Sequence, residues 1–132
     1  MNTFSGLQKL DLSNNNLCSR AGEYIGDVLI ENPNYCLKEL SFKGNKLEEN
    51  GTRRIIVAAT INTNLKVLNI GVISDFGLDL ISQELMNMKL IKFGFQEDKS
   101  NPFSDKSKDK FIGTLRSRSN SYFDYRGISK WN

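Results

Sequence analysis

The sequence contains LQKLDLSNNNL at residues 7–17 and LKELSFKGNKL at residues 37–47, two copies of one pattern set 30 residues apart. Both copies have apolar residues at the first, fourth, sixth and eleventh positions and asparagine at the ninth. The spacing of Leu10 and Leu12 is that of a strand, whose side chains alternate between its two faces. The pattern therefore predicts a short strand followed by a turn that contains an asparagine.

Two weaker copies follow, LKVLNIGVISD from residue 65 and LIKFGFQED from residue 90, which start 28 and 25 residues further along. The third copy has Ile73 in place of the asparagine and Asp75 in place of the last leucine. Apolar residues at helical spacing lie between the copies, which predicts a helix after each of the first three strands. These residues are Ala21, Ile25, Val28 and Leu29, then Ile55, Ile56 and Ala59, then Ile81 and Leu85.

The pattern LxxLxLxxNxL, followed by a glycine and a helix at a period near 28, resembles the ribonuclease-inhibitor class of leucine-rich repeats over about residues 4–96. The resemblance implies an α/β fold: a short solenoid of about three to four repeats, with parallel strands on the concave side and helices on the convex side. Gly22, Gly51 and Gly77 stand where that class places the glycine before its helix. We expect a leucine-rich-repeat domain at residues 1–98 and a basic, aromatic-containing tail or cap at residues 99–132.

Asn15 and Asn45 occupy the ninth position of the two best copies. An asparagine that follows a strand can hydrogen-bond backbone groups where the chain turns. We therefore predict that Asn15 and Asn45 form a structural ladder between neighbouring units, interrupted at Ile73. A ligand-binding or catalytic role for them is the weaker interpretation, because buried amides must satisfy backbone partners.

Histidine is absent from the chain, and the cysteines are Cys18 and Cys36. Histidine is the usual general base and a common metal ligand, and Ser–His or Cys–His nucleophile arrangements depend on it. Two cysteines without close spacing cannot form a zinc site on their own. We therefore expect no enzyme activity, no metal site and no cofactor.

The longest apolar run, residues 55–61, is far shorter than the roughly 18 residues that a membrane helix needs. The first residues lack the basic and then apolar pattern of a signal peptide. The low cysteine content fits a reducing compartment. These features predict a cytoplasmic protein with no membrane partner and no disulfide between Cys18 and Cys36.

Charge is unevenly distributed along the chain. Residues 1–98 contain 10 basic and 12 acidic residues, a net charge of −2, whereas residues 99–132 contain 8 basic and 3 acidic residues, a net charge of +5. The basic excess at the C-terminal end favours acidic partners. It is below that of a dedicated nucleic-acid-binding domain, so we expect a protein partner and not a nucleic acid.

The resemblance implies that the outward-facing strand residues line up in rows and form the partner-binding surface. The predicted rows are Lys9, Glu39, Val67 and Lys92; Asp11, Ser41, Asn69 and Gly94; and Ser13, Lys43, Gly71 and Gln96. The residues expected to contact a partner are Lys9, Asp11, Glu39, Ser41, Lys43, Asn69, Lys92 and Gln96. Lys9 and Glu39 are expected to pair across strands, at a few tenths of a kcal/mol.

Three interpretations fit the segment from about Lys99 onward. The segment is a disordered tail, or Phe111, Ile112 and Leu115 fold back and cap the last unit, or its aromatic and basic residues bind a partner. The candidate partner-binding residues of the tail are Arg116, Arg118, Tyr122, Phe123, Tyr125, Arg126 and Trp131.

The first strand is expected to be open, because residues 1–6 are too few to cover Leu10, Leu12 and the strand's edge. Three explanations remain: the chain is a fragment of a longer protein, it stacks against a partner or itself, or it is ordered only within an assembly. Self-association or a larger complex through this strand is therefore expected.

The pattern as a whole predicts a protein–protein interaction module, a scaffold or adaptor piece of a larger protein or assembly. The alternative is a regulator of an enzyme, such as a GTPase-activating or inhibitor-like protein, because the repeats of those regulators are similar. The asparagine- and lysine-rich composition is typical of AT-rich genomes such as those of protists, where repeats of this class are common in cilia. A ciliary or cytoskeletal complex is one expected setting.

Overall fold

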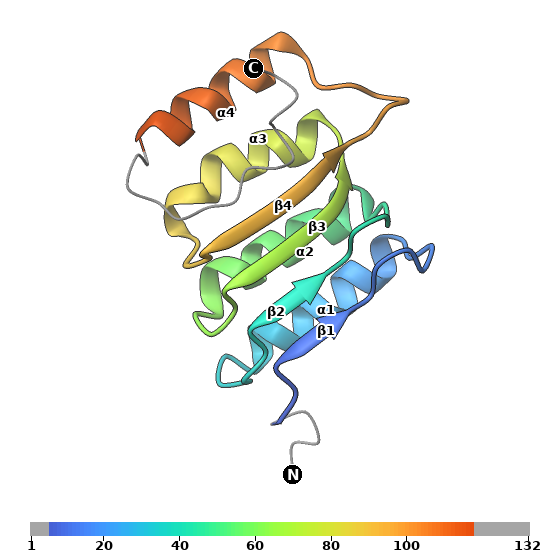
Figure 1. Cartoon of the computed structure of the whole chain (residues 1–132), viewed down its shortest axis with the longest axis vertical. Helices are drawn as coiled ribbons and strands as arrows, with labels where there is room; N and C mark the ends of the chain where they lie inside the picture. Colours follow the sequence, from blue (N-terminus) through green and yellow to red (C-terminus); the bar gives the residue numbers. More distant parts are fainter. Residues whose placement is uncertain (1–5, 118–132) are drawn as a thin grey trace.

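The computed structural model describes residues 6–117 of the chain. Strands and helices alternate along this part (Figure 1). The elements are β1 (Lys9–Asp11), α1 (Ser19–Glu31), β2 (Glu39–Ser41), α2 (Glu48–Ile61), β3 (Val67–Ile73), α3 (Asp75–Glu84), the 3₁₀ turn η1 (Leu85–Asn87), β4 (Lys92–Glu97) and α4 (Asp105–Ser117).

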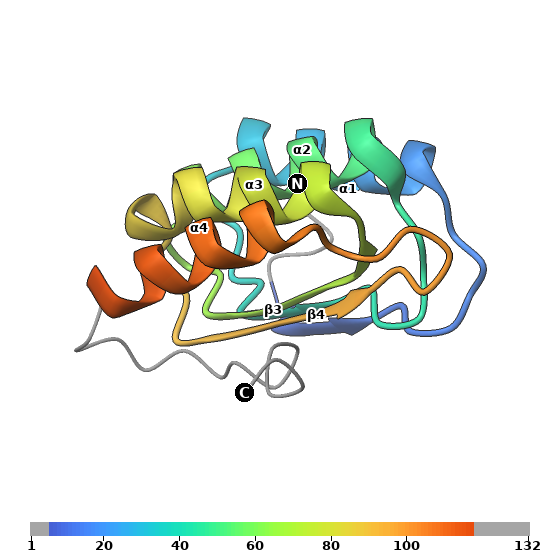
Figure 2. The ribbon, with the colours of Figure 1, turned by 90° about the horizontal axis from the view of Figure 1, so that it is seen from above.

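The strands form one open four-stranded sheet in the order β1-β2-β3-β4, and every neighbouring pair is parallel. The helices lie together on one face of this sheet, as Figure 2 shows from above. Parallel neighbours need a crossover connection, and each crossover here contains a helix. The predicted α/β class with parallel strands is therefore confirmed.

The core lies between the sheet and the helices. Inward-facing residues of the strands form layers across the sheet, such as Leu10, Leu40, Leu68 and Phe93, which are neighbours in the register. The last three are at most 2% exposed. The helices add their own apolar faces, for example Ile55, which is fully buried. Burial of such side chains stabilises the stack by roughly 1.5–3 kcal/mol each.

The register agrees with the first two predicted rows but corrects the third. Lys9 pairs with Glu39, Glu39 with Val67 and Val67 with Lys92, and the row that starts at Asp11 follows in the same way. In the third row Gln96 pairs with Val72 and not with Gly71, because β3 contains a bulge between Asn69 and Val72.

Gly71 makes this bulge sterically possible. Its φ is +83°, a left-handed conformation that favours glycine. A Cβ atom at this position would lie 2.5 Å from the carbonyl oxygen of Asn45 and 2.7 Å from that of Phe42. Both contacts are with the backbone, so β3 can pass this close to the turn after β2 only without a side chain.

The glycines of the helices are not where the resemblance placed them. Gly22, Gly51 and Gly77 lie within the first turns of α1, α2 and α3 and not before the helices. A Cβ atom on Gly22 would lie 2.8 Å from Cα of Gly51, and one on Gly26 would lie 2.9 Å from backbone atoms of Arg54. The glycines of α1 therefore allow close packing of the α1 and α2 backbones.

Residues 98–117 cover the β4 end of the structure. Phe103 and Phe111 are 4% and 0% exposed and belong to the core, and Leu115 packs against it. Helix α4 packs beside α3 (Figure 1). Of the three residues predicted to fold back over the last unit, Phe111 and Leu115 contact the core, whereas Ile112 is half-buried and is not among the residues packed against it.

Two further features bear on earlier expectations. Cys18 and Cys36 are both exposed and free, so they form no disulfide with each other. Within residues 6–117, none of the helices has the length and apolar character required to span a bilayer.

Candidate functional site

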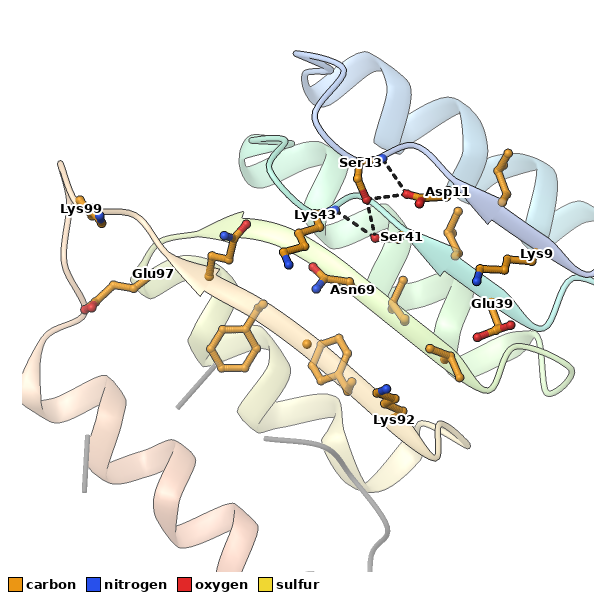
Figure 3. Close-up of a pocket in the computed structure, with 18 residues that line it drawn as sticks. Lys9, Asp11, Ser13, Glu39, Ser41, Lys43, Asn69, Lys92, Glu97 and Lys99 are labelled. Carbon is orange, nitrogen blue, oxygen red and sulfur yellow. Dashed lines mark hydrogen bonds between the residues drawn. The ribbon is translucent and has the colours of Figure 1, made fainter. Parts of the chain in front are cut away.

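The face of the sheet opposite the helices carries a groove of about 610 Å³, which we call the sheet groove. All four strands contribute to it, together with the turns that follow β1, β2 and β4 (Figure 3). Its lining residues are Lys9, Leu10, Asp11, Ser13, Glu39, Leu40, Ser41, Lys43, Val67, Leu68, Asn69, Lys92, Phe93, Gly94, Phe95, Gln96, Glu97 and Lys99.

The structure brings all eight residues predicted to contact a partner into this groove, although Lys43 lies in the turn after β2 and not on a strand. They come from segments up to 87 residues apart, from Lys9 to Gln96, and the parallel register aligns them. Ser13, Glu97 and Lys99 also line the groove but were not among the predicted contact residues. Ser13 stood in a predicted row. Glu97 belongs to the fourth copy of the pattern but to none of the predicted rows, and Lys99 follows that copy, just after the end of β4.

Charges of both signs line the groove. Four lysines and three carboxylates line it, so the groove has a formal charge of +1. Lys9 and Glu39 are register neighbours, but no salt bridge within 4 Å joins these two described residues. The predicted cross-strand ion pair is therefore an adjacency without direct contact.

A chain of hydrogen bonds connects the ends of β1 and β2 at one side of the groove (Figure 3). The Ser13 hydroxyl donates to the Asp11 carboxylate, and the backbone N–H of Ser13 donates to the same oxygen at 3.0 Å. Since the Ser13 proton is used in this way, the Ser41 hydroxyl donates to Ser13 across 3.0 Å. Ser41 in turn accepts the backbone N–H of Lys43 at 3.3 Å.

This network determines what Asp11 can do. Hydrogen bonds from Ser13 favour the charged carboxylate and lower the pKa of Asp11 below its ordinary value of 3.8. A carboxylate with a lowered pKa is a poor general base, so the Asp11–Ser13 pair is badly suited to activate a nucleophile. It is well suited to hold a fixed acceptor towards a partner.

The side chains of Gln96 and Asn69 line the groove and also form hydrogen bonds with the backbone. The Gln96 side chain accepts the backbone N–H of Gly44 at 3.0 Å, which ties β4 to the turn after β2. The Asn69 side chain accepts the backbone N–H of Gly71 at 2.9 Å and so holds the bulge. Both residues thereby fix the shape of the groove floor.

Asn45 and Asn15 differ in their environment. Asn45 is 1% exposed, and its side chain accepts the N–H groups of Asn15 and Leu17 at 3.1 and 2.8 Å and donates to the carbonyls of Leu12 and Phe42 at 2.8 and 3.0 Å. It therefore links the turns that follow β1 and β2. The Asn15 side chain is exposed and donates to Ser13 of its own turn at 3.2 Å.

Arg116, the predicted tail residue that the structure describes, does not line the groove. Arg116 lies on α4, in the helix layer on the other face of the sheet, and its side chain is exposed. Arg118, Tyr122, Phe123, Tyr125, Arg126 and Trp131 lie outside the described residues.

Metal-ligating and nucleophilic side chains are few among the residues that line the groove. Within residues 6–117, no group of three or more Cys, Asp or Glu side chains could hold a metal ion. The groove lining contains neither cysteine nor histidine, and its hydroxyls are those of Ser13 and Ser41. The arrangement can offer hydrogen bonds and charges to a partner at fixed spacing.

No protein-family model matches this chain, and no curated protein matches it at a significant level.

Proposed function

We propose that this chain is a protein–protein interaction module of the leucine-rich-repeat type, and that it binds its partner in the sheet groove. The observation that carries the proposal is the alignment of polar and charged side chains in rows across the parallel strands. Repeats at spacings of 30 and 28 residues place one strand–helix unit after another, which is how a solenoid builds an extended binding surface. A scaffold or adaptor role follows.

The groove chemistry favours a polar protein surface as its occupant. Both lysines and carboxylates line it, and the Asp11 network presents fixed acceptors. Charges of both signs select a partner with the complementary charge pattern and reject one of a single sign. Contacts of this kind weaken as ionic strength rises, because salt screens exposed charges.

The experiment compares the full chain with two charge-reversed variants in affinity capture from cell extract. Lys9→Glu with Lys43→Glu changes the groove, and Lys106→Glu with Lys110→Glu changes the exposed side of α4 by the same net charge. A groove partner should be lost with the first variant and retained with the second. A partner that both variants retain equally would contradict groove binding.

Purified partner then separates a scaffold from a regulator of an enzyme. A partner that binds stoichiometrically and keeps its own activity fits a scaffold or adaptor. A small GTPase whose GTP hydrolysis the chain accelerates would instead establish the regulator, and would contradict a purely structural role.

A further inference from the structure

The outer side of β1 and α1 resembles a core face that lacks its cover. We call residues 7–36 the first unit and residues 37–64 the second unit, and we compare positions 30 residues apart. Leu7 is 37% exposed, whereas Leu37 is 7% exposed. Four further pairs show the same contrast: Leu10, Leu12, Leu17 and Ile25 are half-buried, whereas Leu40, Phe42, Leu47 and Ile55 are at most 1% exposed.

Asparagines of the second unit bind the backbone of the first. Asn45 does so through three of the four hydrogen bonds described above, those with Asn15, Leu17 and Leu12. Asn64 donates to the carbonyls of Tyr35 and Pro33 at 2.9 and 3.3 Å, and Asn62 donates to that of Leu29 at 3.5 Å. These asparagine side chains therefore bind the second unit to the first at both ends of the strands.

The first unit has asparagines at the same three positions, Asn15, Asn32 and Asn34. The Asn15 side chain donates to the carbonyl of Ser13 and the Asn32 side chain to that of Val28, so each of these side chains binds only within its own unit. The Asn34 amide is exposed and has no hydrogen-bond partner among residues 6–117. The amide groups that bind one unit to the next are thus repeated at an edge where the described structure has no neighbour.

We propose that the outer side of the first unit is an interaction surface for one further strand–helix unit of this same type, carried by a partner polypeptide. Its strand would run parallel to β1 and cover Leu10 and Leu12. The backbone of its turns would form hydrogen bonds with the side chains of Asn15 and Asn34, as the backbone of the first unit does with those of Asn45 and Asn64. A lone added strand would not suffice, because Ile25 of the helix layer also lacks cover.

A second copy of this chain fits the surface less well. A parallel neighbour would have to offer its β4 and α4 end, and the side chains exposed on α4 are mostly charged: Asp105, Lys106, Asp109, Lys110 and Arg116. These residues could not cover half-buried leucines. The inference rests on the repeat-type stacking of the proposed function but not on groove binding, so the two experiments can fail independently.

The test adds such a unit to the full chain. A copy of residues 37–64 is inserted directly before Leu7, so that the new junction repeats the natural one between Asn64 and Leu65. Thermal unfolding and amide hydrogen exchange are measured for the natural and extended chains. We expect the midpoint to rise by at least about 5 °C and exchange along β1 to slow at least about tenfold.

Asn15→Ala is the matched control in both chains. It should lower the midpoint of the natural chain by less than about 1 °C and that of the extended chain by at least about 3 °C, because the amide gains backbone partners only in the latter. An extended chain that is unfolded or no more stable, or an equal effect of Asn15→Ala in both chains, would overturn the proposal. So would a natural chain that sediments as a dimer which Tyr24→Glu, at a site 71% exposed on α1, dissociates.

Discussion

Asp98 lies directly after β4, where the chain leaves the sheet and turns towards α4, and its side chain binds Lys46 and Ser100. Its side chain is 9% exposed, and its carboxylate lies 2.7 Å from the ammonium of Lys46. Ser100 donates both its hydroxyl and its backbone N–H to the same side chain, at 2.7 and 3.0 Å. The hydrogen bonds from Lys46 and Ser100 hold the pKa of Asp98 at about 2, below its ordinary value of 3.8.

A lowered folded-state pKa means that the unfolded chain binds the proton more readily. The stabilisation by Asp98 is therefore complete above about pH 4 and is lost as the pH falls from about 4 to about 2. We expect Asp98→Asn to reduce the free energy of unfolding at pH 7 by about 1 kcal/mol, a modest value because Lys46 is largely exposed. Urea unfolding at pH 7 and at pH 2.5 measures this free energy, and the difference from the natural chain should shrink at the lower pH.

Asp109→Asn, at an exposed site on α4, is the control for Asp98→Asn. A difference between Asp98→Asn and the natural chain that is equally large at both pH values would show that the carboxylate charge is not its cause.

Single residues were predictable where the repeat pattern is complete. The pattern located Asn45 because an asparagine that follows a strand has backbone partners within reach. It could not locate Asp98, whose partner Lys46 is 52 residues away and comes close only in the folded chain. It also missed the bulge at Gly71, since an extra residue in one strand is set by the close approach of the Asn45 and Phe42 carbonyls.

Among the helices and strands, α4 is the one whose sequence predicts its burial least well, yet it covers the end of the core. Its segment is polar, and its apolar residues are too few to predict burial by periodicity. In the structure Phe111 lies 5.6 Å from Phe95 between ring centroids, at an interplanar angle of 81°, and Phe95 contacts Phe103 in a similar edge-on geometry. These aromatic contacts help to hold α4 over the end of the core.

We therefore expect Phe111→Ala to reduce the free energy of unfolding by about 3–4 kcal/mol, because it opens a cavity beside Phe95. Ile112→Ala, one residue further along and only half-buried, should cost about 1 kcal/mol or less. Urea unfolding followed by circular dichroism measures both values. Equal effects of the two substitutions would mean that α4 does not cover the core through Phe111.

At the scale of the whole molecule, extensive contacts join each strand–helix unit to the next. The helices pack in succession, α1 with α2, α2 with α3 and α3 with α4, and the strands pair in the same order. Under the proposed leucine-rich-repeat assignment, stability would be approximately the sum of the units and of the interfaces between neighbours. The two ends differ, because Phe103 and Phe111 cover the last unit whereas Leu10 and Leu12 of the first unit stay half-buried.

This asymmetry predicts a gradient of local stability along the chain. Helix α1 buries Leu29 as its one fully buried apolar side chain, whereas α2 buries Ile55, Ile56, Ala58 and Ala59. Amides of α1 should therefore exchange with solvent at least about tenfold faster than those of α2 and β3, through openings about 1.4 kcal/mol or more below global unfolding. Hydrogen exchange with mass spectrometry, repeated at low urea concentrations, distinguishes the two processes, because global unfolding depends strongly on urea and local opening depends weakly. Uniform protection from α1 to α4 would show instead that the first unit is as well supported as the others, and that its half-buried leucines cost the fold little.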